Sequence, residues 1–424
     1  MRLGYLHIGP SWHGIVRYGR LLASEASKRP DMSVVEAAVT LGEDRQHNHK
    51  LLLDAATQLS STEVVHIQFS YVNNKSLWGH DWQQLKYLRF FIRNCSSPIV
   101  VTLHDLHTPP PSFKAALSKL KGSQAKSTEQ QTVLESSDQG TLARQTASRK
   151  VSDKSVESPA AQQSIPLRAI RFLRYLLRPN VLSLYWLLKQ ARLTFVCSGE
   201  EAKRLSHLSD DSRTICIPHF IEQRSSTIDQ AKAKELLDLE TGKIVTLLGF
   251  IHPIKGHRLM IEALPHLSQD VTVVFAGGAQ SPGQKQFVKD LTALAEAKGV
   301  HKRLKVTGYL SEQELEYYLL ATDLAVCPFE SMCASGSLST WLSLAQPILA
   351  YDLPQIAEYN AYEPGAIHVF HSYEATALAQ SIEHILATVS QDKVPAGVRL
   401  QQRLSLPSVF DQHLTSYGNV LPHC

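Results

Sequence analysis

The chain alternates short apolar runs with longer segments in which apolar residues recur at helical spacing. The alternation is clearest between residues 244 and 360, where each apolar run is followed by a small or turn residue and then by a segment of helical period. This pattern predicts strand, loop and helix in repetition, which builds a parallel sheet with helices on both faces. In such sheets, ligands bind beyond the carboxyl ends of the strands.

The predicted strand ends of this region carry small residues and one cation. These residues are Gly249, Lys255, Gly256, Gly277, Gly278, Ser335, Gly336 and Ser337. Small side chains let a ligand approach the backbone closely, and a lysine attracts an anion. Together they indicate a site for a phosphorylated ligand.

The first half of the chain repeats the same architecture. Strands are predicted at residues 2–9, 34–39, 63–69, 98–105, 194–197 and 214–218, and helices at about 15–28, 49–59 and 77–94 and from Gly199 onward. A polar stretch near residues 222–242 then precedes the second set of strands. A chain of 424 residues usually forms more than one domain. We therefore predict two facing α/β domains of Rossmann-like architecture, residues 1–222 and 223–404, with a ligand cleft between them.

Three segments depart from this regular pattern. Residues 112–164 are dominated by Ser, Gln, Lys, Thr and Ala, so they cannot bury enough apolar area to offset the cost of ordering the backbone, and we predict a disordered insertion. Residues 165–178 place arginines on one helical face and leucines on the other. This helix either packs on the first domain or lies at the inner face of a membrane, drawn to anionic lipid. Residues 405–424 predict a helix that returns to the first domain.

Composition narrows the function classes. A net charge of +4 is too small to argue for a nucleic-acid partner, and we predict none. No apolar run reaches the length of a spanning helix, and the N-terminal residues lack the pattern of a signal segment. The six cysteines are scattered without paired-ligand spacing, which favours a reducing cytoplasm and no metal site.

Ten segments follow one another in an order typical of a known enzyme group. They are GIVRYGRLLASE, VVHIQFSY, IVVTLHD, FVCSGEEAKRL, CIPHFIE, LLGFIHPIKG, VVFAGG, VTGYLSEQEL, ASGSL and AQPILAYDLPQIAEY. Outside the insertion, the chain thus resembles the retaining GT-B glycosyltransferases, the glycogen-synthase-like sugar-nucleotide group (glycosyltransferase family 4, group 1).

The resemblance implies the GT-B fold and a specific reaction. A hexosyl group would move, with retention, from a nucleoside diphosphate sugar held by the second domain to a glycan, lipid-linked or other hydroxyl acceptor held by the first. It implies no cofactor beyond this donor substrate, and no metal. The setting it implies is polysaccharide or glycoconjugate synthesis, in the cytoplasm or at the inner face of the membrane.

On the donor side, Lys255 follows a strand and a turn, so its ammonium can reach the cleft. The segment from Ser335 through Gly336, Ser337 and Leu338 predicts a helix that continues to about Ala345, whose first amides would bind phosphate. Gly249 ends the preceding strand.

The donor side also departs from the family pattern. Where the family carries an arginine near Lys255, this chain has Phe250 or His252, and His252 is a cation only when protonated. The family often carries two glutamates at the positions of Met332 and Thr340, so both carboxylates are missing here.

Two further carboxylates are expected at the donor site. Glu330 lies close to the first missing position, and a loop could bring it into the cleft. The resemblance implies that Glu358 lines the donor cleft.

On the acceptor side, His104 ends a buried strand directly before Asp105. The resemblance places this histidine beside the transferred sugar and the leaving phosphate, which makes His104 and Lys255 the candidate catalytic residues. His66 and Gln68 end the neighbouring strand and are predicted to line the acceptor pocket.

The first predicted helix supplies the remaining acceptor-side residues. Gly14 and the Ile15 amide lie at its start, and Arg17 lies further along it. Two alternatives stay open for the whole chain: a catalytically weak GT-B scaffold protein, and a sugar-nucleotide epimerase of the same fold.

Overall fold

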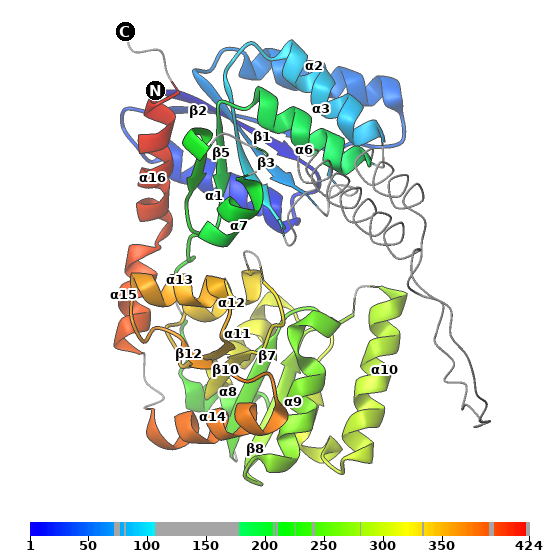
Figure 1. The fold of residues 1–424 in the computed structure, drawn as a ribbon, viewed down its shortest axis with the longest axis vertical. Coiled ribbons are helices and arrows are strands. Elements are labelled where there is room, and N and C mark those ends of the chain that lie inside the picture. Colours follow the sequence, from blue (N-terminus) through cyan, green and yellow to red (C-terminus); the bar gives the residue numbers. More distant parts are fainter. Residues whose placement is uncertain are drawn as a thin grey trace, which may run out of the picture.

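Two parallel six-stranded sheets form the framework of the molecule (Figure 1). The computed structural model describes residues 1–71, 77–79, 82–106, 178–206, 208, 211–224, 226–239, 242–279, 281–332, 335–389 and 394–420. The predicted insertion at 112–164 and most of the basic segment at 165–178 lie outside the described residues.

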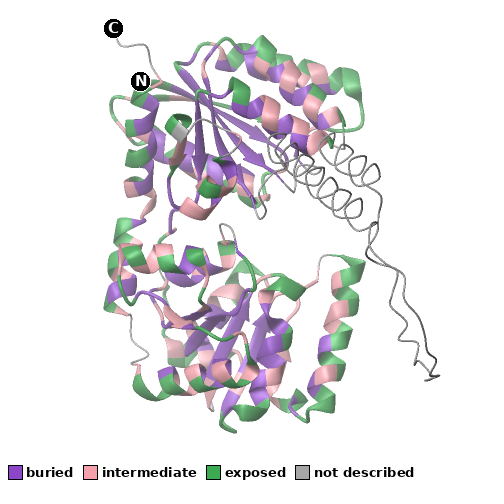
Figure 2. Ribbon diagram, viewed as in Figure 1, coloured by how far each residue is buried: buried purple, intermediate pink, exposed green. Residues whose placement is uncertain are grey.

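The first sheet has the strand order β2-β1-β3-β4-β5-β6. Its strands are β1 (Arg2–Ile8), β2 (Ser33–Val39), β3 (Val64–Ser70), β4 (Ile99–His104), β5 (Leu193–Val196) and β6 (Thr214–Cys216). Every residue of β3 and β4 is buried, as expected for central strands of a sheet covered on both faces (Figure 2).

Helices cover both faces of this sheet. They are α1 (Gly14–Ser27), α2 (Arg45–Leu59), α3 (Trp82–Asn94), α6 (Pro179–Gln190), α7 (Gly199–Leu205) and α16 (Leu406–Gly418), with a 3₁₀ turn at Asp211–Arg213. α2, α3 and α6 share one apolar core, and α1 and α16 share another on the opposite face.

The second sheet has the order β12-β11-β10-β7-β8-β9. Its strands are β7 (Lys243–Leu248), β8 (Val271–Ala276), β9 (Leu304–Val306), β10 (Leu324–Cys327), β11 (Ile348–Tyr351) and β12 (His368–Phe370). Helices cover both faces of this sheet, and their apolar residues form one core on each face.

The helices of this second unit vary in length. They are α8 (Gln230–Leu236), α9 (His257–Ala263), α10 (Pro282–Ala297), α11 (Glu312–Ala321), α12 (Gly336–Leu342), α13 (Pro354–Tyr362), α14 (Ala375–Thr388) and α15 (Pro395–Arg403), with 3₁₀ turns at Pro253–Lys255, Leu264–His266 and His301–Arg303. The α/β prediction is confirmed.

Three predicted helix boundaries differ from the structure by about one turn. α2 begins before residue 49 because the Asp44 carboxylate accepts hydrogen bonds from the Gln46 and His47 amides and caps the helix. α3 begins only at Trp82 rather than at residue 77. α12 ends at Leu342 rather than near Ala345, which has a positive φ of 54° and cannot continue a right-handed helix.

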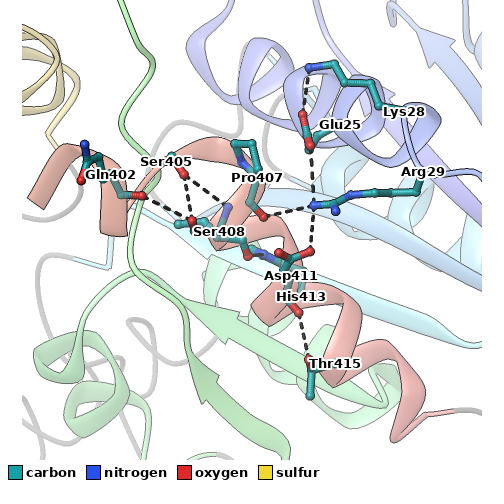
Figure 3. A network of polar contacts seen from close by, with 11 residues as sticks. Glu25, Lys28, Arg29, Gln402, Ser405, Pro407, Ser408, Asp411, His413 and Thr415 are labelled. Atoms are coloured by element: carbon teal, nitrogen blue, oxygen red, sulfur yellow. Dashed lines mark hydrogen bonds and ion pairs between the residues drawn. The ribbon is translucent and has the colours of Figure 1, made fainter. Parts of the chain in front are cut away.

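The chain crosses between the two sheets twice, and the crossings lie side by side. The Ile221 amide donates to the Leu404 carbonyl at 2.7 Å, and Ile221 forms a parallel bridge with Ser405. α16 then runs back along the first sheet (Figure 1). There Arg29, just after α1, pairs with Asp411 of α16 at 2.8 Å, in the polar network that Figure 3 shows.

Candidate active site

A cavity of about 530 Å³ lies between the two sheets' loops. The first domain lines it with His13, Gly14, Ile15, Arg17, Tyr18, Leu21, His104, Asp105, His219, Phe220, Glu222 and Arg224. The facing wall is made by Phe250, Gly336, Ser339, Thr340 and Ser343. The carboxyl ends of β4 and β7 therefore meet at one interdomain cavity, where ligands of such folds bind.

His104 is a buried wall residue of this cavity. Its Nε2 lies 2.8 Å from Gln68 Oε1, and its ring meets the Tyr18 ring edge-on at 5.2 Å between centroids. Burial lowers the pKa of His104 to about 4, with neighbouring Asp105 acting in the opposite direction. The ring is therefore neutral near pH 7, so it can exchange hydrogen bonds with a ligand but carries no charge.

Asp105 follows in a strained conformation, with a φ of 62°. Its Oδ2 accepts a hydrogen bond from Ser70 Oγ at 2.7 Å, at the end of the neighbouring strand. Since positive φ is uncommon outside glycine and clusters at functional sites, this turn marks the strand end as a constrained part of the cavity wall.

His66 and Gln68 lie behind the cavity wall rather than on it. His66 Nδ1 lies 2.7 Å from the Tyr417 hydroxyl, and His66 Nε2 lies 2.7 Å from Thr102 Oγ1. Gln68 joins His66 to His104. The structure therefore does not place either side chain against an acceptor; both stand one layer further in.

The start of α1 forms part of the wall, but two of its polar groups are already engaged. The Ile15 amide donates to His13 Nδ1 at 3.3 Å, and Arg17 pairs with Glu222 at 2.7 Å. Gly14 has no atom near the position that a side chain would occupy. The backbone at Gly14 is thus open to the cavity.

On the second domain, Gly249, Lys255 and Ser337 converge. Lys255 Nζ donates to Ser337 Oγ at 2.8 Å, and a side chain at Gly249 would lie 2.5 Å from both of these atoms. Gly249 has a φ of 110°, a conformation that favours glycine. Only the absence of a side chain here lets the lysine and the serine hydroxyl meet over the end of β7.

Burial lowers the pKa of Lys255, because its ammonium is largely removed from water. Its Nζ also lies 5.3 Å from the centre of the Phe329 ring. The ammonium forms no ion pair among the described residues. Gly249, Lys255 and Ser337 do not themselves line the cavity, but their neighbours Phe250 and Gly336 do.

The rest of the predicted anion site is less open. Ser335 caps α12 by accepting from the Leu338 amide at 3.3 Å. His252 caps the 3₁₀ turn before Lys255, with its Nδ1 accepting from the Ile254 amide at 3.3 Å. Neither side chain lines the cavity.

The two positions that lack the family's glutamates lie in different surroundings. Thr340 lines the cavity, and its hydroxyl donates to the Gly336 carbonyl at 2.8 Å. Met332 is buried in the apolar core of the second domain. Glu330 is exposed and lies off the cavity wall. A carboxylate could therefore be accommodated at residue 340 but not at residue 332.

Glu358 does not line the cavity. Its two carboxylate oxygens accept hydrogen bonds from the Gly199 and Glu200 amides, at 2.9 and 3.1 Å. These amides begin α7 on the first domain, whereas Glu358 belongs to α13 on the second. The side chain thus links the two domains instead of facing a donor.

Sequence reasoning missed several wall residues that come after β6. His219 lies 4.7 Å from the Tyr18 ring, and Phe220 stacks on the same ring at 4.7 Å between centroids. Both follow a predicted strand, so the strand-end rule that selected His104 could have found them. Phe220 also accepts a hydrogen bond from Ser339 Oγ at 3.2 Å across the interface.

The described residues contain neither a metal-binding cluster nor a membrane-spanning helix. No group of three or more His, Cys, Asp or Glu side chains is arranged to hold a metal ion in the described part of the chain. None of the described helices is long and apolar enough to cross a membrane. The four described cysteines, Cys95, Cys197, Cys216 and Cys327, are all free thiols.

Comparison with known proteins adds a family to this geometry. Residues 242–388 match the family model described as "Glycosyl transferases group 1". The D-inositol 3-phosphate glycosyltransferase of Xylanimonas cellulosilytica is 31% identical over 85 residues, which are 20% of this chain and 20% of that protein.

Solved structures agree in fold over the whole length. HepE of Anabaena, in complex with UDP, aligns with a TM-score of 0.64 at 13% identity and covers 99% of both chains. Sucrose-phosphate synthase of Thermosynechococcus elongatus aligns with a TM-score of 0.61 at 15% identity, again over 99% of both chains. The chain thus has the two-domain GT-B fold, and its second domain carries the match to the group 1 glycosyltransferases.

Proposed function

We propose that this protein is a retaining glycosyltransferase that moves a hexosyl group from a nucleoside diphosphate sugar to a hydroxyl acceptor. The observation that carries the proposal is the meeting of Lys255, Ser337 and Gly249 at the end of β7. A half-buried ammonium without a carboxylate partner, beside a bare backbone, suits a diphosphate. This site lies within the segment that matches the glycosyltransferase family.

The reaction would break the bond between the anomeric carbon and the diphosphate oxygen. The acceptor oxygen would bond to the same face of that carbon, and its proton would pass to the departing phosphate oxygen. Lys255 would stabilise the negative charge that develops on the diphosphate, which is the kind of preorganised electrostatic effect that contributes most to such steps. His104, on the facing wall, would hold a hydroxyl of the transferred sugar.

We propose a uridine diphosphate sugar as the first donor to test. HepE, which shares the fold, was solved with UDP and with UDP-glucose. We propose that the donor binds without a metal ion, because Lys255 supplies the charge and the chain has no Asp-x-Asp sequence. The acceptor, a glycan or a lipid-linked sugar of a polysaccharide or glycoconjugate pathway, would bind to the first domain.

A cytoplasmic enzyme that meets lipid-linked acceptors would work at the inner membrane face. The basic residues at 165–178 are the proposed membrane contact. Binding of the protein to anionic vesicles, compared with a variant in which Arg168, Arg171 and Arg174 are replaced by Gln, tests this contact separately from activity.

Calorimetry of UDP-glucose binding tests the donor site. Lys255→Ala should weaken binding by about 1.5–3 kcal/mol, the cost of losing a charge-assisted contact to phosphate. Lys289→Ala, which removes an exposed lysine from α10 of the same domain, should change nothing. Undiminished affinity in Lys255→Ala would refute the proposed site.

Activity assays separate the alternatives. Donor and a panel of hydroxyl acceptors should give a glycoside of retained anomeric configuration, with the same rate in chelator as in manganese. Epimerised donor formed without any acceptor would instead identify an epimerase. No binding of any donor sugar at high concentration would favour a scaffold, the outcome that the missing carboxylates at Met332 and Thr340 motivate.

A further inference from the structure

A chain of buried hydrogen bonds connects His104 to the C-terminal helix. The Tyr417 hydroxyl of α16 lies 2.7 Å from His66 Nδ1. On the other side of that ring, His66 Nε2 lies 3.2 Å from Gln68 Nε2, and Gln68 Oε1 lies 2.8 Å from His104 Nε2. All four side chains are buried, so each polar atom depends on its protein partner.

We infer that Gln68 is a positioning residue that fixes the tautomer of His104. The amide oxygen of Gln68 can only accept, so His104 Nε2 must carry the proton of the neutral ring. His104 Nδ1 is then the nitrogen with a free lone pair. Because His104 lines the cavity and Gln68 does not, Nδ1 is the nitrogen left to accept a hydrogen bond from a sugar hydroxyl.

The amide of Gln68 is itself held in one orientation. Gln68 Nε2 donates to His66 Nε2, which requires His66 to carry its proton on Nδ1 and to donate it to the Tyr417 oxygen. Thr102 Oγ1 also lies 2.7 Å from His66 Nε2. Turning the Gln68 amide over would therefore require the protons of both histidines to move.

Packing supports the same arrangement. A side chain atom added at Gly19 of α1 would lie 3.0 Å from Gln68 Cγ, so α1 presses closely on the glutamine. Burial lowers the pKa values of His66 and His104, which keeps both rings neutral and preserves the direction of the chain. α16 thus contributes to the active site through contacts that never reach the ligand.

This inference deepens the proposed function, and its effect on turnover depends on that function. Its structural part does not, because ring-nitrogen NMR of the free protein reports the tautomer directly. We would label the histidines with ¹⁵N and assign His104 by its loss in His104→Asn. The wild-type ring should be neutral, with its proton on Nε2.

Two variants and a matched control test the chain. Gln68→Leu removes both bonds of the amide, and Tyr417→Phe removes only the remote hydroxyl. Tyr87→Phe is the control, because the Tyr87 hydroxyl is also buried and bonded to a buried amide, that of Asn48 at 3.0 Å, yet has no link to His104. Gln68→Leu should abolish the tautomer preference and lower kcat about tenfold.

In the same experiment, the donor Kd of Gln68→Leu should stay within about twofold of wild type, since the donor phosphates bind to the other domain. Tyr417→Phe should shift the His104 signals in the same direction with a smaller loss of kcat, and it decides the question if Gln68→Leu does not fold. Tyr87→Phe should leave both unchanged. A proton on Nδ1 in the wild type, or His104 signals unmoved by both variants, would overturn the inference. A confirmed tautomer in a protein without transferase activity would refute the proposed function alone.

Discussion

The two sides of the interdomain cavity differ in the side chains that they offer to a ligand. On the second domain, Lys255 Nζ donates to Ser337 Oγ beside Gly249 at the end of β7, next to the wall residues Phe250 and Gly336. The first domain presents His104, a neutral imidazole whose Nε2 is held from behind by the buried Gln68, which in turn bonds to His66. Under the proposed function, the second domain would bind the charged diphosphate and the first would orient sugar hydroxyl groups.

The difference also appears in the titration of the two domains. Burial lowers the pKa of His7, His13, His66, His104, His219 and His413 in the first domain and its returning helix. The same holds for only His257 and His368 among the described residues of the second. Lowering the pH should therefore destabilise the first domain more than the second.

The largest expected effect follows from this imbalance. Because the folded pKa values lie below the unfolded value of about 6.5, the unfolded chain binds more protons, and stability falls as the pH drops from about 6.5 towards 4. A histidine with a folded pKa of about 4, such as His104 or His413, contributes a loss of about 2 kcal/mol at pH 5. Hydrogen exchange at pH 7 and pH 5 should show the first domain opening more than the second.

The same experiment has an internal check. His413→Gln should reduce the acid sensitivity of α16 and its neighbours if the variant folds, since one proton-binding group is gone. Equal loss of protection in both domains at pH 5 would show that the buried histidines do not dominate acid unfolding.

The next effect in size concerns Gly249. Gly249→Ala places a side chain where φ is 110° and where Lys255 Nζ and Ser337 Oγ would each lie 2.5 Å away. We expect a stability loss of about 1–3 kcal/mol and a marked loss of donor affinity, measured by thermal denaturation and calorimetry. Gly283→Ala, at an open position of α10 in the same domain, is the control. Unchanged donor affinity in Gly249→Ala would contradict a donor site at Lys255 and Ser337.

The smallest effect concerns the contact between the walls. Glu358→Gln leaves one oxygen to serve the Gly199 and Glu200 amides, so it should cost about 1 kcal/mol and speed hydrogen exchange at the start of α7. Glu363→Gln is the matched control, because Glu363 pairs with Arg399 inside one domain. Faster exchange in both variants alike would argue against a specific link between the domains.

Local sequence patterns indicate Gly249 and Lys255 more readily than the hydrogen bonds behind His104. A local pattern identifies Gly249 and Lys255, because they are a glycine and a cation that follow a predicted strand. The support of His104 comes from Tyr417, which lies 351 residues from His66 in the chain, and no local pattern joins them. The α/β fold was predictable because apolar runs and helical periods repeat along both halves.

The failures have the same origin. The resemblance implies that Glu358 lines the donor cleft, but its partners are amides of the other domain, and Gly199 lies 159 residues away in the chain. The place of His66 near the end of a strand predicts that it lines the acceptor pocket, but its two ring nitrogens bond to Tyr417 and Thr102. Contacts between distant segments decided both cases.

The division of labour between the two walls is tested most directly by measuring donor Kd and kcat on one preparation each of His104→Ala and Lys255→Ala, with UDP-glucose as the first donor. If the two walls act as proposed, Lys255→Ala raises the donor Kd by about tenfold or more, whereas His104→Ala leaves the Kd nearly unchanged and lowers kcat and kcat/KM together. His104→Ala with wild-type kcat and a reduced Tm would contradict the account, because His104 would then be a core residue and not part of the active site.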